Sequence, residues 1–173
     1  MDTNASLDLI VQAIKRITNP RFYSSERGFQ GQLKSNIDSL LKEDDLFSDH
    51  AIVEEEYQKT LPKHRITHRP DIIIHIPIEE GVTRSRNEGN FVAFELKLQA
   101  NRNDAICAFR KLNDYISILQ YQLGIFVNVD SQVSFVDLVP NERIHILNVL
   151  RDEREVSVIH SFLENGELHS CEL

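Results

Sequence analysis

The sequence predicts an α/β domain in which helices cover a central mixed β-sheet. Three patterns favour this class: apolar residues at helical spacing near the N-terminus, β-branched and aromatic runs in the middle, and a further apolar run after an amphipathic helix. At 173 residues the chain has room for one well-buried core and is too short for two ordinary domains. We therefore expect a single domain over residues 1–173, with a core at about 25–130 and a C-terminal β extension at about 131–173.

Two helices are expected before the sheet. The first spans about 6–17, where apolar residues recur at helical spacing, and Pro20 follows its end. The second spans about 25–41 and carries an apolar stripe that begins at Phe29 and ends at Leu41. The stripe of the second helix could face the sheet.

Three strands are expected next. Residues 51–60 form a weakly patterned strand, whereas 71–78 contain a β-branched run of isoleucines that is typical of a buried strand. Residues 79–90 are polar and contain two glycines, which predicts a turn or loop, and 91–98 form the third strand. The middle of the chain is therefore predicted to supply three strands in succession.

A helical crossover is expected after the third strand. Asn103 and Asp104 favour a helix start, and apolar residues on one face continue to Leu119. Residues 123–129 then read as a buried strand. A strand that returns after a helical crossover favours parallel pairing.

The C-terminal extension is predicted to add strands. Residues 156–163 and 167–173 form a hairpin across Asn165-Gly166, which is a strong two-residue turn signal. The extension also adds residues 133–139 and a segment around 144–150 whose pattern is ambiguous.

The charge is unevenly distributed. The chain has a net charge of −8, but residues 59–111 hold ten basic and six acidic residues, a local balance of +4 that leaves −12 for the remainder. One basic face on an acidic body is compatible with nucleic-acid binding. On charge alone, a generally acidic soluble protein with scattered lysines fits equally well.

The sequence also bears on location. Hydrophobic residues make up 41% and charged residues 27%, and no apolar run approaches the ~20 residues that cross a bilayer. The N-terminus lacks a basic segment followed by an apolar stretch, which argues against a secretory signal. Cys107 and Cys171 have no CxxC partner, which argues against a disulfide framework or structural zinc. We expect a cytoplasmic protein with no membrane association.

Three charged residues occur within or next to predicted strands that are otherwise apolar. Strand alternation places Glu95 and Lys97 on one face of the third strand, opposite a wholly apolar face. Asp71 opens the neighbouring strand directly after Pro70, a position where proline is tolerated. If these strands pair, the two carboxylates converge with the ammonium group beside them.

Such a cluster suits metal-assisted phosphodiester chemistry. Two carboxylates are hard oxygen ligands for Mg²⁺, which also accepts waters and a phosphate oxygen. A lysine beside them can orient the attacking water and stabilise transition-state charge. Taken separately, the Glu-Leu-Lys segment reads as a solvated strand edge and Pro-Asp as a turn. The combination is more specific, because half-buried charges in apolar strands are costly unless they pair or hold a metal.

Pro70-Asp71 and Glu95-Leu96-Lys97 resemble the signature of the PD-(D/E)xK, or restriction-endonuclease-like, nuclease superfamily. The predicted element order over about 25–130 also resembles that family's α-β-β-β-α-β core. The resemblance implies a Mg²⁺-dependent (or Mn²⁺-dependent) nuclease, most commonly a DNA endonuclease of restriction, repair or phage defence. It assigns Asp71 and Glu95 to the metal and Lys97 to the nucleophilic water.

Many members of that family carry a further glutamate on the helix before the sheet. Glu26 matches this position, because its helical stripe is the one expected to face the sheet. An acidic residue at a helix N-terminus is also favoured by the helix dipole, worth ~0.3–1 kcal/mol, so both interpretations stay open. Glu56 on the first strand competes for the same metal-binding role.

Basic residues near the ends of the active strands are candidates for contacts with backbone phosphates. The residues predicted to bind nucleic acid in this way are Arg65, Arg69, Arg84, Arg86, Arg102 and Lys111. For Lys111, as for Tyr115 on the same helix, a solvated position is the alternative.

Three functional hypotheses follow. The first is a metal-dependent DNA endonuclease that acts as a homodimer, because cutting both strands invites two-fold symmetry, or with a protein partner in defence or repair. The second is a catalytically silent subunit that binds nucleic acid or protein, and the third a nuclease that acts on RNA or is activated by a ligand.

Overall fold

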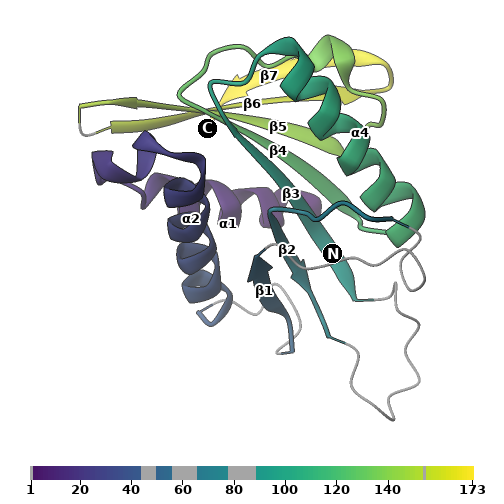
Figure 1. Cartoon of the computed structure of the whole chain (residues 1–173), viewed down its shortest axis with the longest axis horizontal. Helices are drawn as coiled ribbons and strands as arrows, with labels where there is room; N and C mark the ends of the chain where they lie inside the picture. Colours follow the sequence, from purple (N-terminus) through teal and green to yellow (C-terminus); the bar gives the residue numbers. More distant parts are fainter. Residues whose placement is uncertain (1, 44–49, 56–65, 78–88, 154) are drawn as a thin grey trace.

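The computed structural model describes residues 2–43, 50–55, 66–77, 89–153 and 155–173. Within these ranges, helices precede three successive strands, and a further helix leads into the last four strands (Figure 1). The elements are α1 (Thr3–Lys15), η1 (Pro20–Ser24), α2 (Glu26–Leu41), β1 (Ile52–Glu55), β2 (Ile72–His75), β3 (Asn90–Leu98), α4 (Arg102–Leu119), β4 (Leu123–Val129), η2 (Val136–Leu138), β5 (Ile144–Asp152), β6 (Glu155–Glu164) and β7 (Glu167–Glu172).

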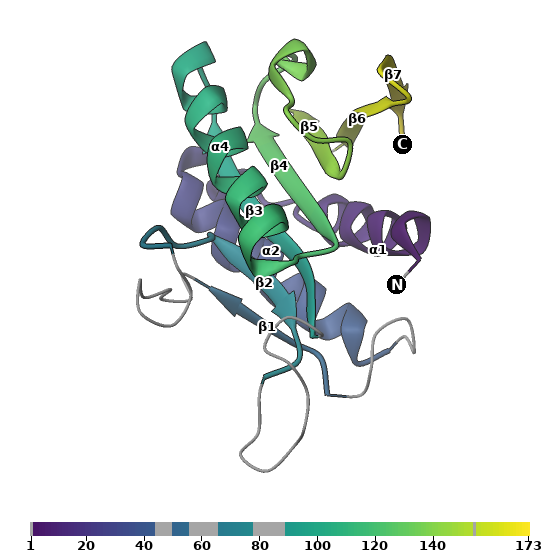
Figure 2. The same cartoon turned by 90° about the vertical axis from the view of Figure 1, so that its right-hand side faces the viewer.

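The seven strands form one mixed sheet in sequence order, β1-β2-β3-β4-β5-β6-β7. The pairs β3–β4 and β4–β5 are parallel, and the other four pairs are antiparallel. Figure 2 shows the sheet continuing from β1 to β7 at the opposite edge. The predicted mixed α/β architecture is confirmed, and the C-terminal extension belongs to the same sheet as the core.

The helices form a layer on each face of the sheet. Apolar residues of α1 and α2 pack with Phe94 and Leu96 of β3 in one core cluster. Apolar residues of α4 pack with Ala93 and Phe126 in a second cluster on the other face. Because alternate residues of a strand point to opposite faces, Glu95 shares the α4 side with Ala93.

Local signals explain where the helices begin. Ser25 caps α2 by accepting a hydrogen bond from the Gly28 N–H, as the predicted boundary requires. The crossover helix α4 begins earlier than its predicted start at Asn103. Asn101 is the N-cap, and the Asp104 carboxylate accepts from its N–H at 3.1 Å in a reciprocal capping box.

The C-terminal patterns resolve into one short helix and three strands. The hairpin prediction is confirmed, with β6 and β7 joined by Asn165 (φ 52°) and Gly166 (φ 78°). Positive φ at both positions is typical of a two-residue hairpin turn. Residues 144–150 belong to β5, whereas within 133–139 the regular structure is the short helix η2.

The second strand is shorter than the sequence pattern indicates, and the first is described over only part of its predicted range. Of the predicted strand at 51–60, β1 occupies 52–55, and residues 56–60 lie outside the described ranges. β2 ends at His75, and most of the predicted loop at 79–90 also lies outside them. No helix within the described ranges is both long and apolar enough to cross a membrane.

Candidate active site

Asp71 directly precedes β2, at the end where the pairing of β2 with β3 stops. The strands pair antiparallel, and the register ends with Ile72 opposite Phe94. The Asp71 N–H donates to the Phe94 carbonyl at 3.0 Å, and its carboxylate Oδ2 accepts from the Leu96 N–H at 2.6 Å. This bond holds the carboxylate against the backbone next to Glu95.

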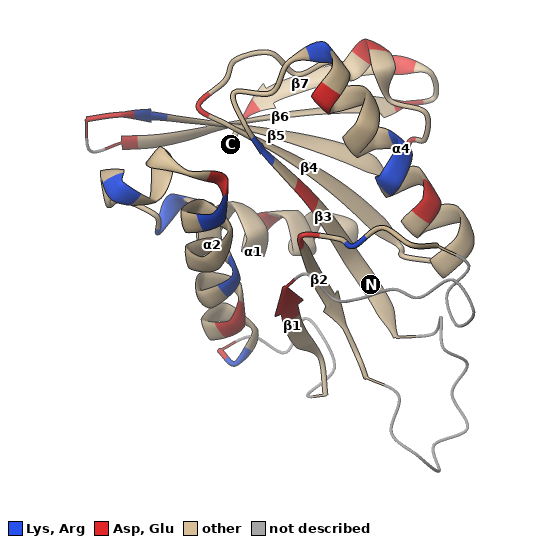
Figure 3. Cartoon of the chain, in the orientation of Figure 1, with Lys and Arg blue, Asp and Glu red and all other residues tan. Residues whose placement is uncertain are grey.

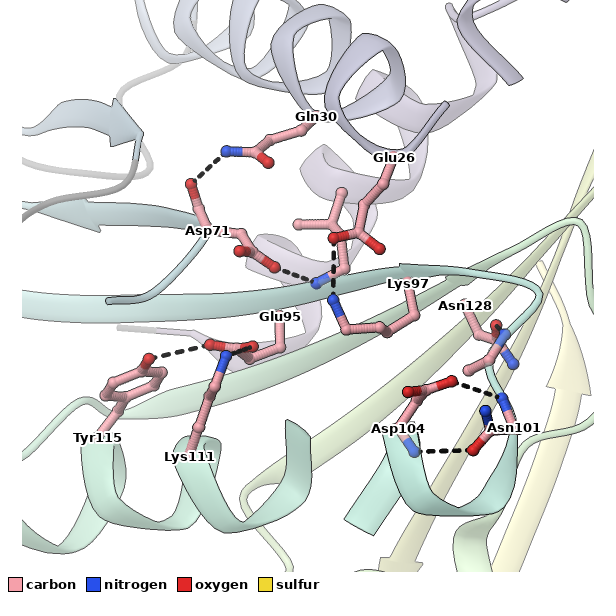
Figure 4. A network of polar contacts seen from close by, with 12 residues as sticks. Glu26, Gln30, Asp71, Glu95, Lys97, Asn101, Asp104, Lys111, Tyr115 and Asn128 are labelled. Atoms are coloured by element: carbon pink, nitrogen blue, oxygen red, sulfur yellow. Dashed lines mark hydrogen bonds and ion pairs between the residues drawn. The ribbon is translucent and has the colours of Figure 1, made fainter. Parts of the chain in front are cut away.

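Glu95 is fully buried between β3 and α4. Its side chain has 0% exposure, and both carboxylate oxygens are engaged by residues one helical turn apart on α4. The Lys111 ammonium donates to Oε2 at 2.8 Å and the Tyr115 hydroxyl to Oε1 at 2.9 Å (Figure 4). The crossover helix therefore fixes the orientation of this carboxylate.

The N-terminal turns of α2 reach the same cluster from the other side. The Lys97 ammonium donates to Glu26 Oε1 at 2.9 Å, and the Gln30 amide donates to the Asp71 carbonyl at 2.8 Å. Glu26 and Gln30 are separated by one helical turn, so both point toward the ends of β2 and β3 (Figure 4). Side chains from α2, β3, α4 and the start of β2 thus converge.

Burial governs the electrostatics of the two acids. It raises the pKa of Asp71, against the lowering effects of the Leu96 N–H and of Lys97. Burial, together with the negative charge of Asp71, raises the pKa of Glu95 to about 7, although Lys111 opposes this. The two carboxylates are therefore near enough to interact, and burial disfavours the charged form of each.

Lys97 remains a cation in this environment. Burial lowers the pKa of its ammonium group, but the hydrogen bond and charge of Glu26, together with the charge of Asp71, outweigh that effect. The net result is a raised pKa. Glu26 therefore keeps Lys97 protonated at the edge of the cluster.

The raised pKa of Glu95 predicts a pH-dependent stability difference between the wild type and Glu95→Gln. The folded protein holds the Glu95 proton more tightly than the unfolded chain, so this stabilisation is complete below pH 4.5 and is lost as the pH rises through about 7. Without metal, Glu95→Gln should therefore gain stability relative to the wild type over this window, by roughly a few kcal/mol. Denaturant titrations at pH 4.5 to 8 measure the difference in unfolding free energy between the two proteins. Because both proteins contain the same histidines, the contribution of histidine titration cancels in this difference. A constant difference over this range would contradict the prediction.

The donor set fits a hard divalent cation. Among the described residues, no three His, Cys, Asp or Glu side chains are grouped to hold a metal. Mg²⁺ does not require three, since it commonly binds one or two carboxylates and completes its shell with water and substrate phosphate. Asp71 and Glu95 supply this pair of carboxylates, and their buried negative charge is what a cation would neutralise.

The remaining predicted residues are placed in different ways. Glu56, Arg65, Arg84 and Arg86 lie outside the described ranges. Arg69 is exposed two residues before Asp71. Arg102 is exposed at the start of α4, away from the cluster, and pairs with Asp137 at 3.2 Å. Lys111, a candidate for phosphate contact, donates to Glu95 and keeps 34% of its side chain exposed.

Two residues of the cluster were absent from the predicted site. Tyr115 is fully buried, not solvated. The sequence feature that could have identified it is its position four residues after Lys111, on the helix that follows Glu95. Gln30, a buried polar residue, was detectable as the residue one turn after Glu26. Both are i, i+4 relations to a residue already predicted.

The charged residues of β3 stand out from the apolar strands around them. Glu95 and Lys97 are the acidic and the basic residue of β3. Figure 3 shows red and blue on this strand, between α2 and α4. Comparison of the chain with protein-family models, curated proteins and solved structures found no match. Function is therefore inferred from the chemistry of these side chains.

Proposed function

We propose that this protein is a Mg²⁺-dependent nuclease that hydrolyses phosphodiester bonds in DNA, with an active site of the PD-(D/E)xK type. One observation carries the proposal: the buried carboxylate of Glu95 and the half-buried carboxylate of Asp71 interact on adjoining segments, with ammonium groups on both sides. The order α2-β1-β2-β3-α4-β4 supports it, because it agrees with the core order of that superfamily.

The side chains divide the work by position. Asp71 and Glu95 would hold Mg²⁺ or Mn²⁺, which supplies a polarised phosphoryl group and a water of lowered pKa when bound. Lys97 is 26% exposed, so its ammonium group is accessible at the rim and can orient the attacking water and stabilise negative charge. Glu26 positions Lys97 through their ion pair.

Lys97 and Lys111 also account for phosphate binding by an acidic protein. A net charge of −8 repels nucleic acid at long range, so attraction has to be local. The cluster combines three carboxylates with two ammonium groups, and a bound divalent cation would turn this net charge of −1 into +1. One phosphodiester group would then balance it.

Cleavage assays on several nucleic acids test the proposal. Purified protein is incubated with supercoiled plasmid, linear duplex, single-stranded DNA and RNA, in Mg²⁺, in Mn²⁺ or in EDTA. We expect metal-dependent cleavage of DNA that is abolished by EDTA and absent in Glu95→Gln. Asp38→Asn is a matched control, because Asp38 pairs with Lys42 on the exposed surface of α2. Binding without cleavage in either metal would contradict the proposal and favour a non-catalytic subunit.

A further inference from the structure

The two oxygens of Glu95 are held by partners that differ in burial. Tyr115, on Oε1, is fully buried, and its ring packs against Tyr121 and His68 at centroid distances of 6.5 and 5.1 Å. Lys111, on Oε2, keeps 34% of its side chain exposed and ends in a flexible four-carbon stem. Tyr115 is therefore a fixed partner of the carboxylate, whereas Lys111 can leave it without disturbing the core.

Charge makes Lys111 a competitor of any cation at this carboxylate. The ammonium group lies 2.8 Å from Glu95 Oε2 and thus neutralises the same buried charge that a divalent ion would. Two cations that share one carboxylate oxygen repel each other strongly in a partly buried site, so the ammonium group and the ion cannot both stay there. Lys97 does not face this conflict to the same degree, because Glu26 holds it on the opposite side of the cluster.

We propose that Lys111 is a placeholder for the divalent cation. It binds Glu95 Oε2 in the metal-free protein, leaves it when the cation binds, and then contacts a phosphate of the nucleic acid. Tyr115 holds Oε1 in place in both states. This inference rests on the divalent site of the proposed function. It assigns Lys111 two successive partners, one carboxylate and one phosphate. Tyr115 is a positioning residue that acts through Glu95.

Metal titration without nucleic acid tests the first partner. Mn²⁺ is titrated by calorimetry into the wild type and Lys111→Met at pH 8.0, above the pKa of about 7 of Glu95, so that proton competition is reduced. Removing the competing ammonium group should tighten Mn²⁺ binding at least ~5-fold. Lys42→Met is the matched control, because Lys42 forms an ion pair with Asp38 at the same 2.8 Å distance, and its Mn²⁺ affinity should be unchanged.

Oligonucleotide binding tests the second partner. In Ca²⁺, Lys111→Met should bind a short DNA oligonucleotide more weakly than the wild type, and the slope of log K against log salt should fall by about one. Lys111→Arg retains the charge and should bind Mn²⁺ no more tightly than the wild type. Lys111→Gln, which keeps a polar tip, should show the gain in Mn²⁺ affinity even if methionine disturbs packing.

The outcomes that would overturn the placeholder role differ from those that would overturn the nuclease site. If the wild type binds Mn²⁺ but Lys111→Met and Lys111→Gln bind it equally or more weakly, the placeholder role is overturned and the proposed nuclease site stands. The placeholder role is likewise overturned if oligonucleotide affinity and its salt slope are unchanged in both variants. If the wild type itself binds no Mn²⁺, the divalent site of the proposed function fails, and the placeholder role fails with it.

Discussion

Lys97→Met is expected to lower the rate of DNA cleavage by about 100- to 1,000-fold while leaving Mn²⁺ affinity equal or higher. The ammonium group lies at the partly exposed edge of the cluster, where charge would develop on the phosphate in the proposed reaction, and a protonated amine is no ligand for a cation. Its loss therefore removes transition-state stabilisation without removing a metal-binding oxygen. Single-turnover cleavage, with calorimetric Mn²⁺ titration of the same samples, measures both quantities.

Two controls separate the role of Lys97 from a structural one. Lys42→Met removes a lysine ion pair on the opposite end of α2 and should cleave at the wild-type rate. Glu26→Gln keeps Lys97 but removes its charged partner, and it should lose less activity than Lys97→Met. A Lys97→Met protein that cleaves within about threefold of the wild-type rate would refute a catalytic role for this lysine.

Asp71→Asn is expected to weaken Mn²⁺ binding by about 100-fold or more and to reduce cleavage to background, because one of two carboxylate ligands is lost. The substitution is nearly isosteric, and the asparagine carbonyl oxygen can still accept the Leu96 N–H that Oδ2 accepts in the wild type. The fold at the start of β2 should therefore survive. Calorimetry and circular dichroism on one preparation distinguish loss of ligand from loss of structure.

The matched control for Asp71→Asn is Asp38→Asn. This substitution removes one carboxylate from an exposed ion pair with Lys42, distant from β3, and should leave Mn²⁺ affinity and cleavage unchanged. If Asp71→Asn is folded and binds Mn²⁺ as tightly as the wild type, the carboxylate serves only to bond the Leu96 N–H, and the metal site lies elsewhere.

The elements that the sequence predicted well are those with a strong local signal. The isoleucine run of β2, the apolar run of β4 and the Asn165-Gly166 turn each combine a periodicity with clear boundaries. The segment at 144–150 was ambiguous, because a short apolar run fits a strand or a helix equally well. Its structure depends on the neighbouring strand β4, against which β5 pairs in parallel. Residues 133–139 were expected to extend the β region, but the regular structure there is the short helix η2.

Part of the site was predictable because it follows from strand alternation. Asp71, Glu95 and Lys97 could be placed together once β2 and β3 were taken as neighbours. The partners from the helices were harder, since the ion pair of Lys97 with Glu26 joins residues 71 positions apart. Lys111 and Tyr115 were expected to face solvent because they are polar and lie off the apolar stripe of α4. Their polar tips instead bind the buried carboxylate of Glu95, which makes an inward position favourable for them.

The most direct measurement is a crystal structure of the protein soaked in Mn²⁺, with the ion located by its anomalous scattering. We expect a peak bonded to carboxylate oxygens of Asp71 and Glu95, at a distance of about 2.1 Å. We also expect Lys111 Nζ to have moved out of hydrogen-bond distance of Glu95 Oε2. A well-ordered site with no Mn²⁺ peak, or with the peak bonded to other residues, would contradict the proposed metal centre.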